Sequence, residues 1–169
     1  GVIFFSDKIE KYIPPKKGRR HILYIIREML DFHPENRKTD INTAMEFLMN
    51  VVKRRCIAFL LSDFCECGDF DNSLVIGNKK HDIIAIQVYD VREKTLPDIG
   101  LINVLDAETG HTMYIDTSSK KIRTSHTLHW LQQEERLQHT FNRSKVDNIS
   151  IATSDDYVKS LIQLFALRR

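Results

Sequence analysis

The chain has 169 residues, of which 42% are hydrophobic and 28% charged, a balance typical of one globular domain. A net charge of +2 gives no support to nucleic-acid binding, and no apolar run approaches the roughly 20 residues of a membrane-spanning helix. Three cysteines, an odd and small number, do not suggest a disulfide framework. Free thiols are typical of a reducing compartment, so we expect a cytoplasmic protein, and we expect no membrane segment in it.

The first predicted element is a strand over Val2–Phe5, whose four side chains are all apolar. A strand that is apolar on both faces is typical of the centre of a parallel sheet. Because a domain rarely begins on its central strand, we expect the natural chain to continue upstream of Gly1. A second extended segment, Ile9–Ile13, follows and is stopped by Pro14 and Pro15.

Two amphipathic helices come next. In the first, apolar residues recur at helical spacing from Ile22 to Leu30. The second begins after Thr39-Asp40 and keeps the same period over Ile41–Val52. The basic Lys53–Arg55 follows it and complements the dipole of the helix.

The middle of the chain alternates strands with a helix. Cys56–Leu61 is predicted to be a buried strand, Asn72–Lys79 a short helix, and Ile83–Val88 a second strand that is apolar at nearly every position. Such alternation predicts βαβ units, with a parallel sheet and right-handed crossovers.

The last third of the chain predicts a mixture of elements. Leu101–Leu105 and His111–Ile115 are typical of a hairpin that turns at Glu108–Gly110. A weakly amphipathic helix is expected over about Ser118–Arg143, followed by a short strand over Ile149–Ala152.

A final helix is capped by the polar run Thr153–Asp156. Its inner face is expected to consist of Val158, Leu161, Ile162 and Phe165. We see no repeat or linker, so residues 1–169 are predicted to form one domain. Its expected fold is α/β: a three-layer, open, mainly parallel sheet with helices on both faces, truncated at the N-terminus.

Two oxygen-bearing side chains are expected at one edge of this sheet. Asp63 follows the strand Cys56–Leu61, and Thr39 precedes the helix that leads into that strand. Open α/β sheets bind ligands at the carboxyl ends of their strands, and oxygen donors suit Mg²⁺ or Mn²⁺. Three further residues are expected at the rim of the site: Ser6, Asp40 and Ser62. Two simpler roles stay open, Thr39 as a helix N-cap and Asp63 as the start of a turn.

Two segments resemble parts of the metal-ion-dependent adhesion site of von Willebrand factor A domains: Arg37–Ala44 and Ile57–Phe64. More closely, the chain resembles the bacterial family called domain of unknown function 58, which accompanies MoxR-type ATPases. The segments that carry this resemblance are Phe5–Asp7, Ile13–Arg19, His81–Glu93, Leu96–Gly100 and Asp106–Gly110.

The resemblance implies a von Willebrand factor A-like domain whose metal loop contacts an acidic residue of a protein partner. Family members of this kind are thought to assist assembly or activation of protein complexes. The family-type site also needs an Asp-x-Ser-x-Ser motif, which the chain lacks; Asp116–Lys120 comes close without the last hydroxyl. Thr39 and Asp63 are therefore expected to be half of a metal site, and to hold a cation weakly.

We accordingly predict a protein-interaction module rather than an enzyme. One alternative is a metal-dependent hydrolase that uses the acidic loop after the strand 56–61, with the carboxylates of Asp63, Glu66, Asp69 and Asp71. Another is a structural domain whose site has decayed. Exposed strand edges would also let two copies associate. The histidines of the long helix, His126, His129 and His139, are expected on a solvated face.

Overall fold

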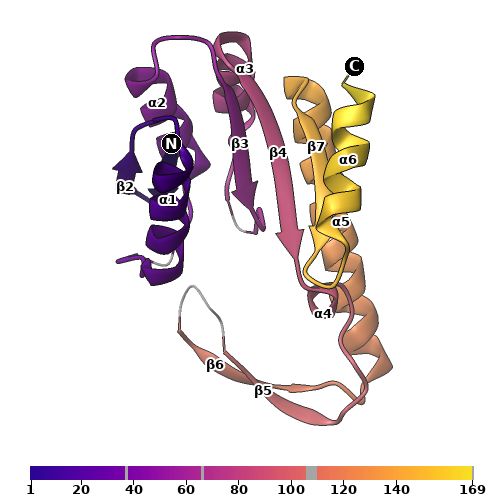
Figure 1. Ribbon diagram of the computed structural model, residues 1–169. Helices are drawn as coiled ribbons and strands as arrows, with labels where there is room; N and C mark the ends of the chain where they lie inside the picture. The colour runs from indigo at the N-terminus through magenta and orange to yellow at the C-terminus, as the bar shows by residue number, and fades with distance from the viewer. Residues whose placement is uncertain (37, 66, 106–109, 169) are drawn as a thin grey trace.

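The computed structural model describes residues 1–36, 38–65, 67–105 and 110–168 (Figure 1). Arg37, Glu66 and most of the predicted turn at Glu108–Gly110 lie outside the described residues.

The described strands form three separate sheets (Figure 1). The largest is parallel, with the order β3 (Ile57–Ser62), β4 (Asp82–Tyr89) and β7 (Asp147–Ala152). The predicted α/β class and the parallel pairing of the two middle strands are therefore confirmed.

The described helices follow the predicted ones closely, apart from the short α4. They are α1 (Arg19–Asp31), α2 (Ile41–Val51), α3 (Asp71–Lys80), α4 (Val91–Lys94), α5 (Lys120–Ser144) and α6 (Tyr157–Leu167). None of the helices in the described ranges combines the length and the hydropathy that crossing a membrane requires.

β1 (Val2–Phe5) is not a central parallel strand, so that prediction is wrong. It pairs antiparallel with β2 (Ile9–Ile13) in a two-stranded sheet. The chain reverses at once, with the amide of Ser6 donating to the carbonyl of Lys8 at 2.9 Å, and the following segment is therefore the strand within reach. The four residues of β1 are half-buried: Phe4 stacks on Phe32, and Phe5 packs against the main core.

α1 and α2 lie on opposite faces of the β1–β2 sheet. Lys11 of β2 forms an ion pair with Glu28 of α1, whereas its neighbour Tyr12 packs edge-on against Phe47 of α2 with ring centroids 5.4 Å apart. Successive residues of a strand point to opposite faces, so the two contacts place the two helices on opposite sides.

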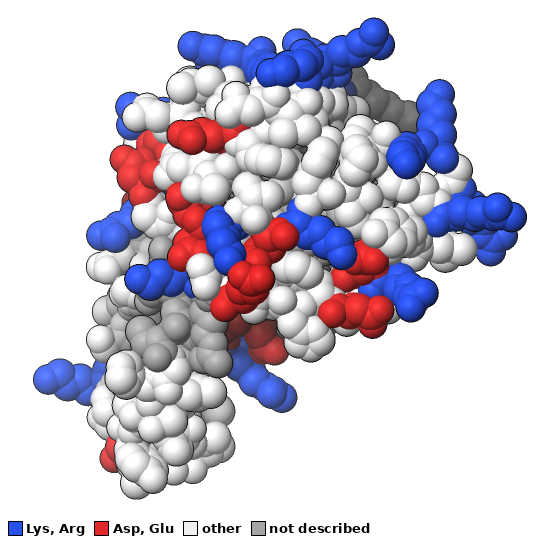
Figure 2. Space-filling model, turned by 90° about the vertical axis from the view of Figure 1, so that its left-hand side faces the viewer, with Lys and Arg blue, Asp and Glu red and all other residues white. Residues whose placement is uncertain are grey.

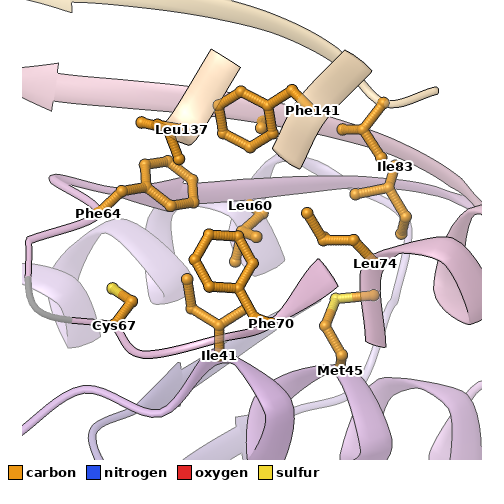
Figure 3. Packing of buried hydrophobic residues seen from close by; sticks show 12 residues of the cluster. Ile41, Met45, Leu60, Phe64, Cys67, Phe70, Leu74, Ile83, Leu137 and Phe141 are labelled. Carbon is orange, nitrogen blue, oxygen red and sulfur yellow. The ribbon is translucent and has the colours of Figure 1, made fainter. Parts of the chain in front are cut away.

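The main core lies between one face of the parallel sheet and the helices α2, α3 and α5. Figure 3 shows Phe64 and Phe141 meeting edge-to-face, with their ring centroids 5.3 Å apart. Ile41 of α2 and Leu74 of α3 are fully buried beside them. These contacts fix the end of β3 against α5.

The opposite face of the sheet is covered only in part. α6 packs on β4 and β7 through Leu164, which meets Ile84, Ile86 and Ile151. Nothing in the described structure covers β3 there beyond the contact between Phe59 and Phe165, whose ring centroids are 6.2 Å apart.

The prediction that the strand Cys56–Leu61, now β3, is buried is therefore wrong for one of its two faces. Ile57, Phe59 and Leu61 are 62%, 45% and 54% exposed, while Ala58 and Leu60 between them face the main core. An edge strand that no helix covers can be apolar on both faces and still be half open to water.

The predicted inner face of the last helix is also partly wrong. Leu161 packs against the sheet, but Val158, Ile162 and Phe165 are exposed, and Leu164 takes the buried position instead. The helix is therefore rotated relative to the prediction, so that Leu161 and Leu164 are the residues that face β4 and β7.

The predicted hairpin is confirmed as β5 (Leu101–Leu105) paired antiparallel with β6 (Thr112–Asp116). It extends beneath the ends of β3 and β4 as a two-stranded arm (Figure 1). Thr117 holds the base of the arm, because its amide and hydroxyl both donate to the carbonyl of Gly100, at 2.8 and 2.7 Å.

Candidate functional site

A pocket of about 150 Å³ lies at the carboxyl ends of β3 and β4. Asp63 enters it from the loop after β3, Gln87 from β4 and Glu93 from α4. One side of α5 forms the opposite wall, including His129 and Trp130. The pocket therefore sits where open α/β sheets usually bind their ligands.

Asp63 is exposed in this pocket and also shapes its loop. Its Oδ1 accepts the amide of Cys65 at 3.1 Å, and the hydroxyl of Ser62 accepts the amide of Phe64 at 3.0 Å. Phe64 adopts the left-handed conformation, with φ of 58°. The turn-forming role that the sequence left open is thus present, and it coexists with a place in the pocket.

The residues around the start of α2 take structural roles. Asp40, rather than Thr39, is the N-cap, because its carboxylate accepts the amide of Asn42 at 2.9 Å and the hydroxyl of Thr43 at 2.7 Å. These hydrogen bonds, most of all the one from Thr43, keep the pKa of Asp40 below its ordinary value.

Ser6 lies next to this cap rather than in the pocket. Its carbonyl accepts the amide of Asp40 at 2.9 Å, and its buried hydroxyl donates to Glu10 at 2.7 Å. The structure thus joins Ser6 to Asp40, and Ser62 to Asp63. Of the five predicted site residues, Asp63 alone lines the pocket.

The carboxylates of the acidic loop do not converge. Asp69 accepts the amide of Asp71 at 3.1 Å, and Asp71 forms an ion pair with Arg143 at 3.2 Å; Glu66 lies outside the described residues. In the described ranges, no three His, Cys, Asp or Glu side chains are close enough together to hold a metal ion. These donors do not fit a resident Mg²⁺, which needs six oxygens in an octahedron.

The α5 wall of the pocket is the part that the sequence analysis missed. His126 and His129, which the sequence predicts on a solvated helix face, and Trp130, for which it predicts no role, all line the pocket. Their spacing, continued by Gln133 and Leu137, is that of one side of a helix, and it is the signal that could have revealed them.

An ammonium group already lies at the edge of this wall. The Nζ of Lys94 is 4.2 Å from the ring centroid of Tyr89 and 4.0 Å from the carboxylate of Glu134. Tyr89 in turn packs against Trp130, with ring centroids 5.7 Å apart. Aromatic rings and carboxylates so arranged attract cationic groups.

A second cluster of chemically capable side chains lies at the other end of the sheet. The Sγ of Cys56 is 3.4 Å from Nδ1 of the fully buried His81. Burial raises the pKa of Cys56, and burial followed by the charges of Lys80 and Arg55 lowers that of His81. Both groups are therefore neutral at pH 7, which argues against a reactive thiolate there.

Comparison with known proteins gives uncharacterized relatives. The chain is 25% identical to the uncharacterized protein MAV169 of Mycobacterium avium, over 93% of this chain and 94% of that protein. It is also 25% identical to the uncharacterized protein Rv1480 of Mycobacterium tuberculosis, where all of this chain matches but only 54% of the relative is covered. The chain thus spans about half the length of that relative.

A solved structure is similar only weakly. An uncharacterized membrane spanning protein from Vibrio fischeri aligns with a TM-score of 0.29 and 14% identity, over 86% of this chain and 66% of that one.

Residues 1–136 match the family described as protein of unknown function DUF58. The match includes both middle strands, the arm and the pocket wall as far as Arg136. The chain therefore belongs to the DUF58 family of proteins of unknown function.

Proposed function

We propose that the chain is a protein-interaction module, not an enzyme, and that it binds its partner at the carboxyl edge of the parallel sheet. The observation that carries the proposal is the pocket itself. It combines carboxylates, imidazoles and an indole at the edge where sheets of this class receive ligands.

The exposed side chains of the arm favour a protein partner over a small-molecule ligand. Its side chains Leu101, Leu105 and Tyr114 are all exposed. A two-stranded sheet is marginally stable alone in water, and exposed apolar side chains on it favour contact with another polypeptide. The arm extends beneath the same edge as the pocket, so one partner could contact both (Figure 1).

In this proposal the cation is bound jointly, by this chain and by its partner. The resemblance to the metal-ion-dependent adhesion site suggests that Asp63 contributes an oxygen to Mg²⁺ or Mn²⁺ and that an acidic residue of the partner contributes another. Because the described donors do not fit a resident ion, partner binding and cation binding should depend on each other.

A MoxR-type ATPase is the partner that we propose, with assembly or activation of protein complexes as the joint function. This choice of partner is supported by the resemblance of the chain to the family that accompanies such ATPases.

The test is binding of the purified chain to the MoxR-type ATPase of the same organism, measured by biolayer interferometry with Mg²⁺ and with EDTA. We expect binding that weakens at least about tenfold in Asp63→Ala and in EDTA. Asp31→Ala is the matched control, because Asp31 is an exposed carboxylate on α1. Equal binding by all three proteins would remove Asp63 from the interface, and equal binding in EDTA would remove the cation.

A further inference from the structure

A second surface, remote from the pocket, has the character of an interface. Nine large apolar side chains are exposed on it, and we call them the apolar face. They are Ile22, Ile26, Met29 and Leu30 of α1, Ile57, Phe59 and Leu61 of β3, and Ile162 and Phe165 of α6.

The three parts of the apolar face lie on the same side of the molecule. Phe59 is the register partner of Ile84, which α6 covers, so the exposed side chains of β3 point to the α6 side of the sheet. Across the β1–β2 sheet α1 lies opposite α2, and α2 is the helix that packs on the core face of β3. Figure 1 accordingly shows α1 and α6 in front of the strands, with β3 between them.

α1 makes this arrangement unusual because its apolar stripe points away from the protein. No residue of α1 is buried, and Leu30 is 79% exposed. The helix is attached instead by its polar side, through Glu28 and Lys11, and by the stacking of Phe32, just after it, on Phe4. An amphipathic helix normally turns its apolar stripe toward the core, so a stripe turned outward indicates an additional contact.

The area of the apolar face matches what a stable dimer buries. Half-exposed side chains of this size each leave on the order of 100 Å² in water, so the nine leave roughly 900 Å². Monomeric proteins rarely expose an apolar patch above about 600 Å², and a standard interface buries about 800 Å² per partner.

The charges at the two ends of β3 suit a twofold partner. Lys53, Arg54 and Arg55 precede the strand and are exposed, and the exposed Asp63 follows it. Figure 2 shows Lys and Arg gathered at the top of the molecule, the end at which β3 begins. A twofold axis across β3 would bring the basic end of each strand toward the acidic end of the other.

We propose that two copies of this chain associate face to face through the apolar face, burying α1, the open side of β3 and α6 of each copy. The contact differs from the edge-to-edge pairing that the sequence suggested, because it uses side chains on a sheet face rather than the backbone of a strand. It leaves the arm and the α5 wall of the pocket outside the interface, with Asp63 at the rim, and it does not require the proposed function.

The test is the mass of the full chain in solution, measured by size-exclusion chromatography with light scattering over a wide concentration range. We expect twice the 19.8 kDa of one copy. Ile26→Glu and Ile162→Glu place a charge on two different walls of the apolar face. Each should raise the dissociation constant at least about tenfold, so that the 19.8 kDa species persists to a concentration at least about tenfold higher than in the wild type.

Leu128→Glu is the matched control. Leu128 is an exposed leucine of α5, the helix that covers the other face of the sheet, so its variant should remain dimeric. Circular dichroism of each variant checks that the helices persist. A monomeric wild type at every concentration overturns the proposal. So does a dimer that resists both variants, or a continuous series of larger aggregates without a dimer.

Discussion

Replacing Asp40 by alanine tests whether this residue acts as a cap, as its hydrogen bonds indicate. The substitution removes the acceptor of the Asn42 amide at 2.9 Å and that of the Thr43 hydroxyl at 2.7 Å. Loss of an N-cap costs about 1 kcal/mol, and the second bond adds a fraction of that, so we expect a loss of about 1.5 kcal/mol in the free energy of unfolding. For a chain of this size, that corresponds to a fall in Tm of roughly 3–6 °C.

Urea unfolding followed by circular dichroism at pH 7 measures this loss, and an unchanged m-value shows that the unfolded state is the same. Asp40→Asn keeps an oxygen for the Asn42 amide and should lose no more than about 0.5 kcal/mol. Asp31→Ala removes only an exposed pair with Arg27, 3.6 Å apart, and should change stability even less. An Asp40→Ala protein as stable as the wild type would refute the capping role.

Three further changes test the core, the buried imidazole and a terminal ion pair. Burial lowers the pKa of His81, so the unfolded chain takes up a proton at this residue more readily than the folded one. Lowering the pH below about 6.5 should therefore reduce the free energy of unfolding, and thermal melts of His81→Gln should show a weaker pH dependence. Leu74→Ala should cost about 2–5 kcal/mol in urea unfolding, because Leu74 is fully buried. Arg168→Ala removes pairs with Asp82 and Asp147 and should cost roughly 1 kcal/mol, less at high salt.

The local elements were predictable because their signals are local. Helical spacing from Ile22 to Leu30 gave α1, and the alternation of strands and helices gave the parallel pairing of β3 with β4. What the sequence could not give was the set of long-range neighbours. The apolar Val2–Phe5 is compatible with a central strand and with a small hairpin, and only its pairing with β2 decides between them.

The site was predictable only in part, because several of its residues are brought together by contacts between distant parts of the sequence. Asp63 stands directly after a strand, and that position alone put it at the carboxyl edge. Whether Thr39 or Asp40 caps α2 depends on one residue of register, which a pattern does not resolve. His129 reached the pocket through the packing of α5 against the main core, a contact between residues far apart in the sequence.

Hydrogen–deuterium exchange of the chain with and without the MoxR-type ATPase tests the central claim most directly. We predict that slowed exchange concentrates at the pocket, in peptides that cover Ser62–Cys65 and the stretch of α5 from His126 to Leu137. Exchange in α6 should be unchanged. Binding that protects α6 while the pocket peptides exchange as before would contradict the account.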